Sequence, residues 1–257
     1  MASDTFPIDR KDLIEGLGKG LRLIESFDDD HPRLTPSEAG ERAGLTRTAA
    51  RRYLLSLCHF GYAATDGKLF WLTPRVLRLG ESYLNTARLP RLVQPFIQRV
   101  AMATGETVNV SVLDGHEVVY VARSNSPRVV SIGYHAGARA PAHVVTPGIV
   151  MLSAMGDNEL DRWIAAHDFH AFTSHTVTTP EVFREHVRAA RTLDHWVTEQ
   201  QLDLGLCGIA TALRDRKGEC KGAVGMTMQS ISYTREQMET KLLPLLYEVA
   251  QALRPLL

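Results

Sequence analysis

Residues 35–72 carry the densest set of structural signals in this chain of 257 residues. Thr35 predicts the N-cap of a short helix, Glu38 completes a capping box with it, and Gly44 predicts the end of that helix in a left-handed turn. A second helix follows, and then two strand patterns joined by Asp66-Gly67, a pair that favours a type I′ hairpin. Two short helices followed by a β-ribbon are the layout of a winged helix-turn-helix.

The second helix of this motif is predicted to be amphipathic. Its apolar side is formed by Ala50, Tyr53, Leu54 and Leu57 at helical spacing. The opposite side presents basic and hydroxyl side chains, which are the types that reach guanine edges, thymine methyl groups and phosphates in a major groove. The candidate DNA-binding residues are Thr46, Arg47, Thr48, Arg51, Arg52 and, in the wing, Lys68. A small solvated helical hairpin is the alternative interpretation.

The charge distribution agrees with phosphate binding by this segment. The formal net charge of the chain is +0, yet residues 33–91 hold ten basic and four acidic side chains. A local basic patch in a neutral protein is typical of nucleic-acid binding through one small domain. Chance clustering is the alternative, but it does not explain why the patch coincides with the helix-turn-helix.

Length and composition favour a two-domain protein with substantial cores, since 44% of the residues are hydrophobic. No apolar run reaches the ~18 residues that a membrane span requires. The first residues show no signal-peptide pattern, and Cys58, Cys207 and Cys220 lack metal-binding spacing. We therefore expect free thiols, a cytoplasmic location and no membrane partner.

Two further helices are predicted around the motif. Leu13, Leu17, Leu21 and Ile24 form a helical stripe over residues 12–27, and we expect this helix to pack under the helix-turn-helix. A linker helix is expected over residues 74–89, opened by a Thr-Pro start. Its apolar stripe suits packing against its own domain or pairing with a second copy, and the sequence leaves both open.

From residue 90 the pattern is α+β. Strands are expected at 107–114, 116–122, 128–134, 206–214 and 221–229, with residues 139–143 irregular. Helices are expected at about 92–100, 149–155, 157–166, 181–194 and 234–254. An antiparallel sheet covered by helices follows from this order.

No catalytic motif stands out. The chain has no P-loop, nucleophile elbow, HExxH or CxxC pattern, so we expect no enzymatic activity and no cofactor. His167, His170 and His175 invite a metal interpretation, but their spacing is not that of a helical ligand pair. We therefore expect no metal site and regard these histidines as surface or half-buried side chains.

Several segments together resemble the IclR-type transcriptional regulators. GLGKGLRLIESF, the helix-turn-helix and LTPRVLRLGESYL resemble the N-terminal half of that family, and ARAPAHVVTPGIVMLSA and LCGIATALRDRKGECKGAVGMTMQ resemble its C-terminal half. The resemblance covers the chain from about Lys11 to Leu257, with the helix-turn-helix most similar to the branch controlling aromatic-acid breakdown. It implies an α+β protein with a winged helix-turn-helix at 1–73, a linker helix at 74–89, a GAF-like effector domain at 90–257, and dimers or tetramers on operator DNA.

The resemblance also implies an effector pocket. The residues placed there by family position are Thr146, Pro147, Thr198, Gly208, Gly225 and Thr227. Glycine at 208 and 225 implies room for an aromatic ring, and we expect a leucine at 225 to fill the pocket without unfolding the domain. An anionic effector needs a cation or backbone donors, for which Arg123, Arg139 and His143 are the candidates. A salt bridge or a loop hydrogen bond is the alternative role for each of these three.

The sequence therefore predicts a DNA-binding transcriptional regulator that responds to a small carboxylic acid, with an aromatic acid favoured. Two other classes stay open at this stage. One is an enzyme whose basic domain only docks it, and the other is a GAF-like sensor that binds protein partners. The absent catalytic motifs disfavour the first, and the arginine-rich helix disfavours the second.

Overall fold

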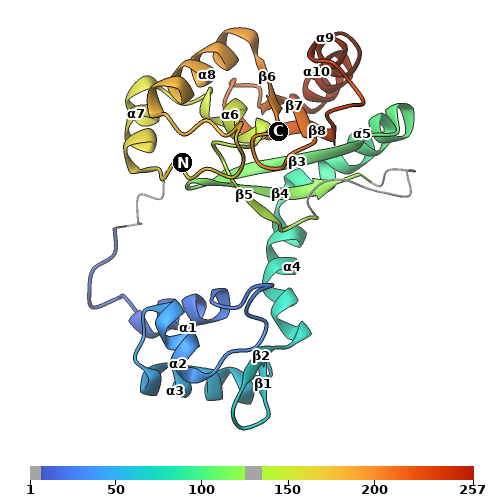
Figure 1. Ribbon diagram of the computed structural model, residues 1–257. Coiled ribbons are helices and arrows are strands. Elements are labelled where there is room, and N and C mark those ends of the chain that lie inside the picture. The colour runs from blue at the N-terminus through green and yellow to red at the C-terminus, as the bar shows by residue number, and fades with distance from the viewer. Residues whose placement is uncertain (1–6, 125–134) are drawn as a thin grey trace. The chain divides into compact units, whose positions relative to one another are not determined.

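The structure is a computed structural model that describes residues 7–124 and 135–257 (Figure 1). It divides into two compact units, one ending at Thr86 and the other beginning at Ala87. The strand expected at 128–134 lies outside the described residues. Among the residues that are described, no helix is long and apolar enough to cross a membrane.

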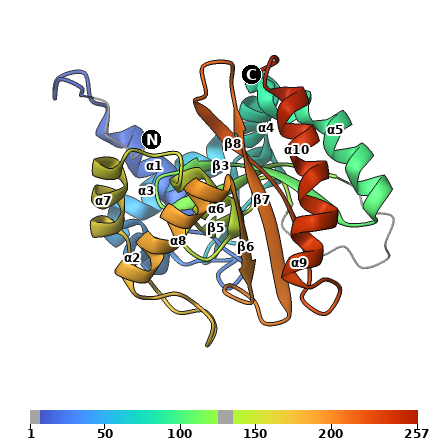
Figure 2. The same cartoon turned by 90° about the horizontal axis from the view of Figure 1, so that it is seen from above.

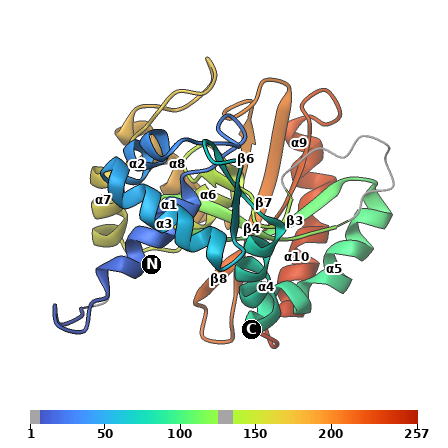
Figure 3. The ribbon, with the colours of Figure 1, turned by 90° about the horizontal axis from the view of Figure 1, so that it is seen from below.

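The first unit is a helix-turn-helix followed by a two-stranded ribbon, as predicted (Figure 3). Its elements are α1 (Glu15–Glu25), α2 (Pro36–Ala43), α3 (Arg47–His59), β1 (Ala63–Thr65), β2 (Phe70–Leu72), a 3₁₀ turn (Pro74–Val76) and α4 (Leu77–Thr86). The expected caps are confirmed. Thr35 and Glu38 form the capping box, Gly44 is left-handed with φ 67°, and the Thr46 side chain accepts a hydrogen bond from the amide of Ala49.

Helix α1 packs against the helix-turn-helix, as expected, but its leucine stripe does not make the contact. Leu17 and Leu21 are 64% and 45% exposed, so the leucine stripe faces away from the helix-turn-helix. The buried residue of α1 is Leu23, which joins the core of this unit. Gly16 and Gly20 lie against the ring of Tyr53 on α3, where a methyl group would already touch it. Small residues, rather than the leucines, therefore give α1 its close approach to α3.

The turn of the wing differs from the predicted type I′ turn at Asp66-Gly67. A type I′ hairpin centred on Asp66-Gly67 needs positive φ at both residues, but only Gly67 has it, at 98°. Thr65 pairs with Phe70, so four residues separate the strands. The carboxylate of Asp66 accepts hydrogen bonds from the amides of Lys68 and Leu69. This bonding by an aspartate side chain to amides further along replaces the tight turn.

The second unit is built on one antiparallel sheet of six strands in the order β5-β4-β3-β8-β7-β6. The strands are β3 (Thr107–Asp114), β4 (Glu117–Arg123), β5 (Arg139–Pro141), β6 (His195–Glu199), β7 (Leu206–Arg214) and β8 (Cys220–Gln229). The helices are α5 (Arg88–Thr104), α6 (Thr146–Leu152), α7 (Asp157–Ala166), α8 (Pro180–Leu193), α9 (Arg235–Gln237) and α10 (Leu243–Leu253), with a π turn (Met238–Leu242) between the last two. The predicted α+β class is confirmed.

Three element predictions need correction. Residues 139–141 form the edge strand β5 instead of an irregular loop, since Ala140 pairs with Val118. Strand β6 was not predicted at all. The linker helix ends at Thr86 because Ala87 is extended, and α5 begins at the next residue.

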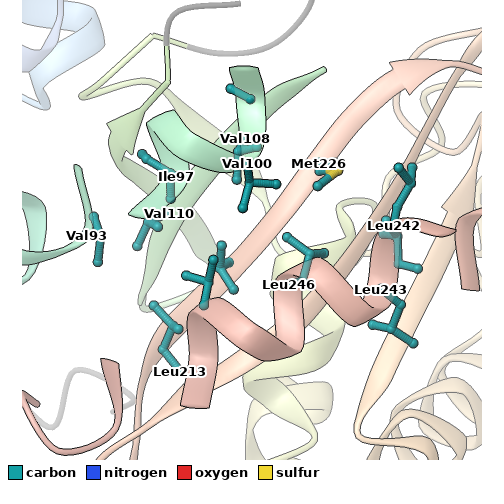
Figure 4. Packing of buried hydrophobic residues seen from close by; sticks show 14 of the residues in the cluster. Val93, Ile97, Val100, Val108, Val110, Leu213, Met226, Leu242, Leu243 and Leu246 are labelled. Atoms are coloured by element: carbon teal, nitrogen blue, oxygen red, sulfur yellow. The ribbon is translucent and has the colours of Figure 1, made fainter. Parts of the chain in front are cut away.

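Helices cover both faces of the sheet (Figure 2). Helices α5 and α10 lie on one face, and α6, α7 and α8 lie on the other. The face under α5 and α10 is packed with aliphatic side chains such as Val108, Val110 and Met226 (Figure 4). Because the sheet is covered on both sides, polar side chains on its central strands have little contact with solvent.

Candidate functional site

The first candidate site is the outer surface of α3. Arg47, Thr48, Arg51 and Arg52 are all exposed, while Ala50 and Leu54 on the other side are fully buried. Within the described part of the chain, no ion pair engages Arg47 or Arg51. Their guanidinium groups are therefore available to bases or phosphates.

Arg52 lies at the flank of this surface. Together with Lys19 of α1 and Thr46 it borders an open groove between α1 and α3. The wing places exposed Lys68 at its tip, and the guanidinium of Arg33 lies 4.4 Å from the ring centre of Trp71. Basic groups thus occur on the helix, at its flank and on the wing, although their DNA contacts stay a prediction.

The second candidate site is a cavity on the α6 side of the sheet. The space there is about 550 Å³ when the open solvent at its mouth is included. Thr146 and Pro147 of α6, Thr198 of β6, Gly208 of β7, and Gly225 and Thr227 of β8 all line it. The structure thus brings together every residue that the family resemblance placed in the pocket, and their ligand contacts stay a prediction.

A hydrogen bond joins helix and sheet across this cavity. The hydroxyl groups of Thr146 and Thr198 lie 2.5 Å apart, and either can be the donor. Gly208 pairs with Thr198 in the sheet, and a methyl group on it would come within 2.7 Å of the Thr146 hydroxyl. The glycine therefore leaves the space in which these two threonines meet.

Gly225 has a different role from the one expected. A methyl group at this position would lie 2.8 Å from the backbone oxygen of Ile209 and 2.8 Å from Cβ of Ala210. The first side-chain atom would therefore collide with the neighbouring strand β7. Because of this clash, a leucine at 225 would disturb the sheet, and the expectation that it fills the pocket without unfolding the domain is wrong.

The three expected cations do not line the cavity. Arg139 is engaged by two carboxylates, with its Nη2 2.7 Å from Asp114 and its Nε 2.6 Å from Glu117. Arg123, at the end of β4, is half-buried and outside the described lining. The alternative role, a salt bridge, holds for Arg139. Among the described lining residues, the one side chain with a full charge at neutral pH is Asp203, an acid.

His143 belongs instead to a chain of three imidazole rings. Nδ1 of His116 lies 3.0 Å from Nδ1 of His167, and Nε2 of His167 lies 2.8 Å from Nδ1 of His143. Nε2 of His143 lies 3.1 Å from the carbonyl oxygen of His170 and must donate to it. In the described residues, no group of histidine, cysteine and acidic side chains is arranged to hold a metal ion.

Among the lining residues that sequence reasoning missed are two buried amides, Asn109 on β3 and Gln201 after β6. Asn109 is 4% exposed and Gln201 is 8% exposed. Within the described residues, neither amide atom of Asn109 nor Oε1 of Gln201 has a hydrogen-bond partner. The alternation of Thr107, Asn109 and Ser111 with valines was the available signal, but it also fits a strand whose polar side faces water.

Comparisons with known proteins identify a family for both parts of the chain. The model of the "IclR helix-turn-helix domain" matches residues 16–67, and that of "Bacterial transcriptional regulator IclR C-terminal" matches residues 81–254. The p-hydroxybenzoate hydroxylase transcriptional activator of Acinetobacter baylyi is 39% identical over 96% of this chain and 93% of its own.

Two solved structures are also similar. A transcriptional regulator from Rhodococcus sp. RHA1 superposes with a TM-score of 0.80 at 35% identity, over 94% of this chain and 97% of its own. The inducer-binding domain of the PobR transcription factor from Acinetobacter, a double mutant in complex with 3-hydroxybenzoic acid, gives 0.63 at 32% identity, over 66% of this chain and all of its own. The family models and these similarities show that the chain belongs to the IclR family of bacterial transcriptional regulators.

Proposed function

We propose that this regulator binds a hydroxylated aromatic carboxylic acid in the cavity between α6 and the sheet, and that the ligand controls its action at an operator. The single observation that carries the proposal is the buried cavity, floored by Gly208 and lined by hydroxyl and amide groups. An apolar site with a few placed polar groups is what a small aromatic ligand requires. The relative that binds 3-hydroxybenzoic acid supports the same ligand class.

The lining residues imply how an anionic ligand is held. Because no cation lines the described cavity wall, neutral donors must receive a carboxylate. The hydroxyl groups of Ser111, Thr146, Thr198 and Thr227 are among the side-chain donors there, together with the amides of the lining. This arrangement differs from the arginine or histidine contact expected from the sequence.

We infer that the protein acts by binding and not by catalysis. Burial raises the pKa of the Cys207 thiol to about 11, so it stays protonated at neutral pH and is a poor nucleophile. Among the described lining residues, the hydroxyls of Thr146 and Thr198 bond to each other, and no hydrogen bond joins a threonine hydroxyl to the carboxylate of Asp203. The target of such a regulator is chromosomal, which places it in the cytoplasm.

For DNA, we propose that Arg47, Thr48 and Arg51 contact base edges, with Thr46, Arg52 and Lys68 at the phosphates. One winged helix reads only a few base pairs, so specificity in a genome calls for two or more copies. Leu17 and Leu21 of α1 and Leu77 of α4, all at least 45% exposed, are apolar surface that a second copy would cover. A dimer or tetramer on a two-half-site operator follows, and light scattering showing a monomer at micromolar concentration would contradict it.

The proposal is tested with the full chain and 4-hydroxybenzoate. Calorimetric titration should show saturable binding, and fluorescence anisotropy should show that the ligand changes affinity for the chain's own promoter duplex but not for a scrambled one at the same salt concentration. Arg51→Ala is the matched control, since it should lose promoter selectivity and keep ligand affinity. Absence of ligand binding to the wild type would refute the effector assignment.

A further inference from the structure

Asn109 lines the cavity with a buried side-chain amide that has no hydrogen-bond partner among the described residues. It lies on the central strand β3, directly opposite Gly225 of β8, on the face that meets the cavity. It is 96% removed from solvent, and both its amide oxygen and its amide nitrogen lack partners within the described residues. A buried polar atom left without a hydrogen bond destabilises the folded state, because it has lost its bonds to water without replacing them.

This unfavourable arrangement is kept at a position where an apolar residue would fit the fold. The neighbours of Asn109 along the strand, Val108 and Val110, are fully buried apolar residues on the other face. Gly225, the cross-strand partner of Asn109, contributes no side chain beside it. Since the unpartnered atoms border a cavity, the group that satisfies them must come from what occupies the cavity.

Sheet geometry sets the shape of that occupant. Asn109 on β3 and Thr198 on β6 are three strand spacings apart, roughly 14 Å across the sheet, and they lie in different cross-strand rows. Gly225 adjoins Asn109 in one row. Gly208 adjoins Thr198 in the other, while Thr227 of β8 lies beside Gly208. The cavity floor thus has a polar side chain at each end with a glycine next to it, which fits a flat ring with polar groups on opposite sides.

The two ends differ in hydrogen-bonding character. Asn109 presents an unused NH2 group with two donors and an unused carbonyl acceptor, and a hydroxyl group can pair with either kind. A carboxylate only accepts hydrogen bonds, so it would leave the Asn109 oxygen unpaired and facing negative charge. At the other end, Thr146 and Thr198 are bonded to each other, which leaves one of their two hydroxyl hydrogens to donate, and the amide NH2 of Gln201 can donate as well. The Gln201 oxygen, which has no partner in the described residues, is an acceptor at this end.

We propose that Asn109 is a specificity-determining residue that binds the ring hydroxyl of the effector, with the carboxylate of the same ligand at the Thr146–Thr198 end. This inference rests on the proposed function and names which end of the ligand each end of the cavity binds. It implies that the regulator distinguishes hydroxybenzoates from benzoate through one neutral side chain.

The test compares 4-hydroxybenzoate with benzoate by calorimetric titration of the full chain. In the wild type, 4-hydroxybenzoate should bind about tenfold more tightly, as one well-formed hydrogen bond provides. Asn109→Leu, which has similar volume and no polar atoms, should reduce this ratio to about twofold or less, mainly by weakening 4-hydroxybenzoate. Thr198→Val is the matched control, because it removes a hydroxyl at the carboxylate end and should weaken both ligands alike.

A second variant tests the orientation of the ligand. Asn109→Asp keeps acceptors for a ring hydroxyl, so discrimination between the two ligands should survive, whereas a carboxylate at this end would be repelled and 4-hydroxybenzoate binding lost. A melting curve without ligand gives an independent measurement. Asn109→Leu should raise the melting temperature of the second unit, because it removes two unpaired buried polar atoms.

The outcomes separate the two proposals. If the wild type binds 4-hydroxybenzoate and Asn109→Leu keeps the wild-type ratio, the role of Asn109 is refuted and the proposed function stands. Loss of 4-hydroxybenzoate binding in Asn109→Asp would refute the orientation. If the wild type binds neither aromatic acid, the proposed function fails and this inference fails with it.

Discussion

Acidification should destabilise the second unit through His167. Hydrogen bonding fixes the protonation of the three-ring chain, starting from the His143 Nε2–H that donates to a carbonyl oxygen. His143 Nδ1 must then accept from Nε2–H of His167, and Nδ1 of His167 must accept from Nδ1–H of His116. Every ring is neutral in this chain, and an added proton on His167 would face another N–H.

The expected size follows from the pKa of His167. Burial, followed by the neighbouring rings of His143 and His116, lowers this pKa from 6.5 to about 3. Since the unfolded chain takes up the proton near its ordinary pKa and the folded chain does not, the stability is complete above about pH 6.5 and decreases as the pH falls toward 3. At about pH 5 the difference corresponds to about 2 kcal/mol, and solvent reaching the half-buried ring reduces it to about 1–2 kcal/mol.

Urea unfolding of wild type and His167→Gln at about pH 8 and about pH 5 measures this effect. Glutamine offers one acceptor and one donor but does not titrate, so the variant should lose about 1–2 kcal/mol less than the wild type between the two pH values. Tryptophan fluorescence reports the transition locally, because the ring of Trp163 stacks on His167 with centroids 4.3 Å apart. His175→Gln, at an exposed position, should behave as the wild type. Equal losses in wild type and His167→Gln would refute this reasoning.

Two further predictions concern the DNA surface and the sheet. Arg51→Ala should weaken operator binding by about 1–3 kcal/mol and relax base preference, whereas Lys68→Ala should weaken all duplexes alike and reduce the salt-dependence slope by about one, both measured by anisotropy across a salt series. Unchanged selectivity in Arg51→Ala would exclude the proposed docking. Gly225→Ala should lower the unfolding free energy by about 1–3 kcal/mol because its methyl group meets the backbone of β7. Gly80→Ala, in a helix with open space around it, should instead stabilise by about 0.5–1 kcal/mol in the same urea assay.

Local signals gave the most accurate sequence predictions. The Thr35–Glu38 capping box, the left-handed Gly44 and the Thr46 cap each depend on residues within four positions of one another. Such interactions depend on neighbouring residues and not on tertiary packing, so they can be predicted from a single sequence. The prediction of a type I′ turn in the wing was wrong because the carboxylate of Asp66 accepts hydrogen bonds from the amides of Lys68 and Leu69 and so stabilises a longer loop.

Questions about which side of an element is buried were harder. Periodicity shows that Leu17 and Leu21 share a face of α1, but not whether that face meets the core, a second copy or solvent. Tyr53 fills the space beside Gly16 and Gly20, which brings the opposite side of α1 to α3. This arrangement depends on a residue more than thirty positions away and could not be predicted from the helix alone.

For Asn109 too, the sequence pattern did not show whether its side of the strand is buried or faces water. The burial of this polar side chain bears on ligand binding. Alternating polar residues usually mean that one face of a strand is wet, yet β3 lies in a sheet with helices on both faces. Polar side chains enclosed in this way are stable only if they form hydrogen bonds with one another or with a molecule bound in the cavity. Thr146 and Thr198 bond to each other, whereas Asn109 does not find a partner among the described residues. A ligand that hydrogen-bonds to the amide of Asn109 therefore stabilises the folded second unit relative to the unit without ligand. Ligand binding and the stability of this sheet are thereby linked.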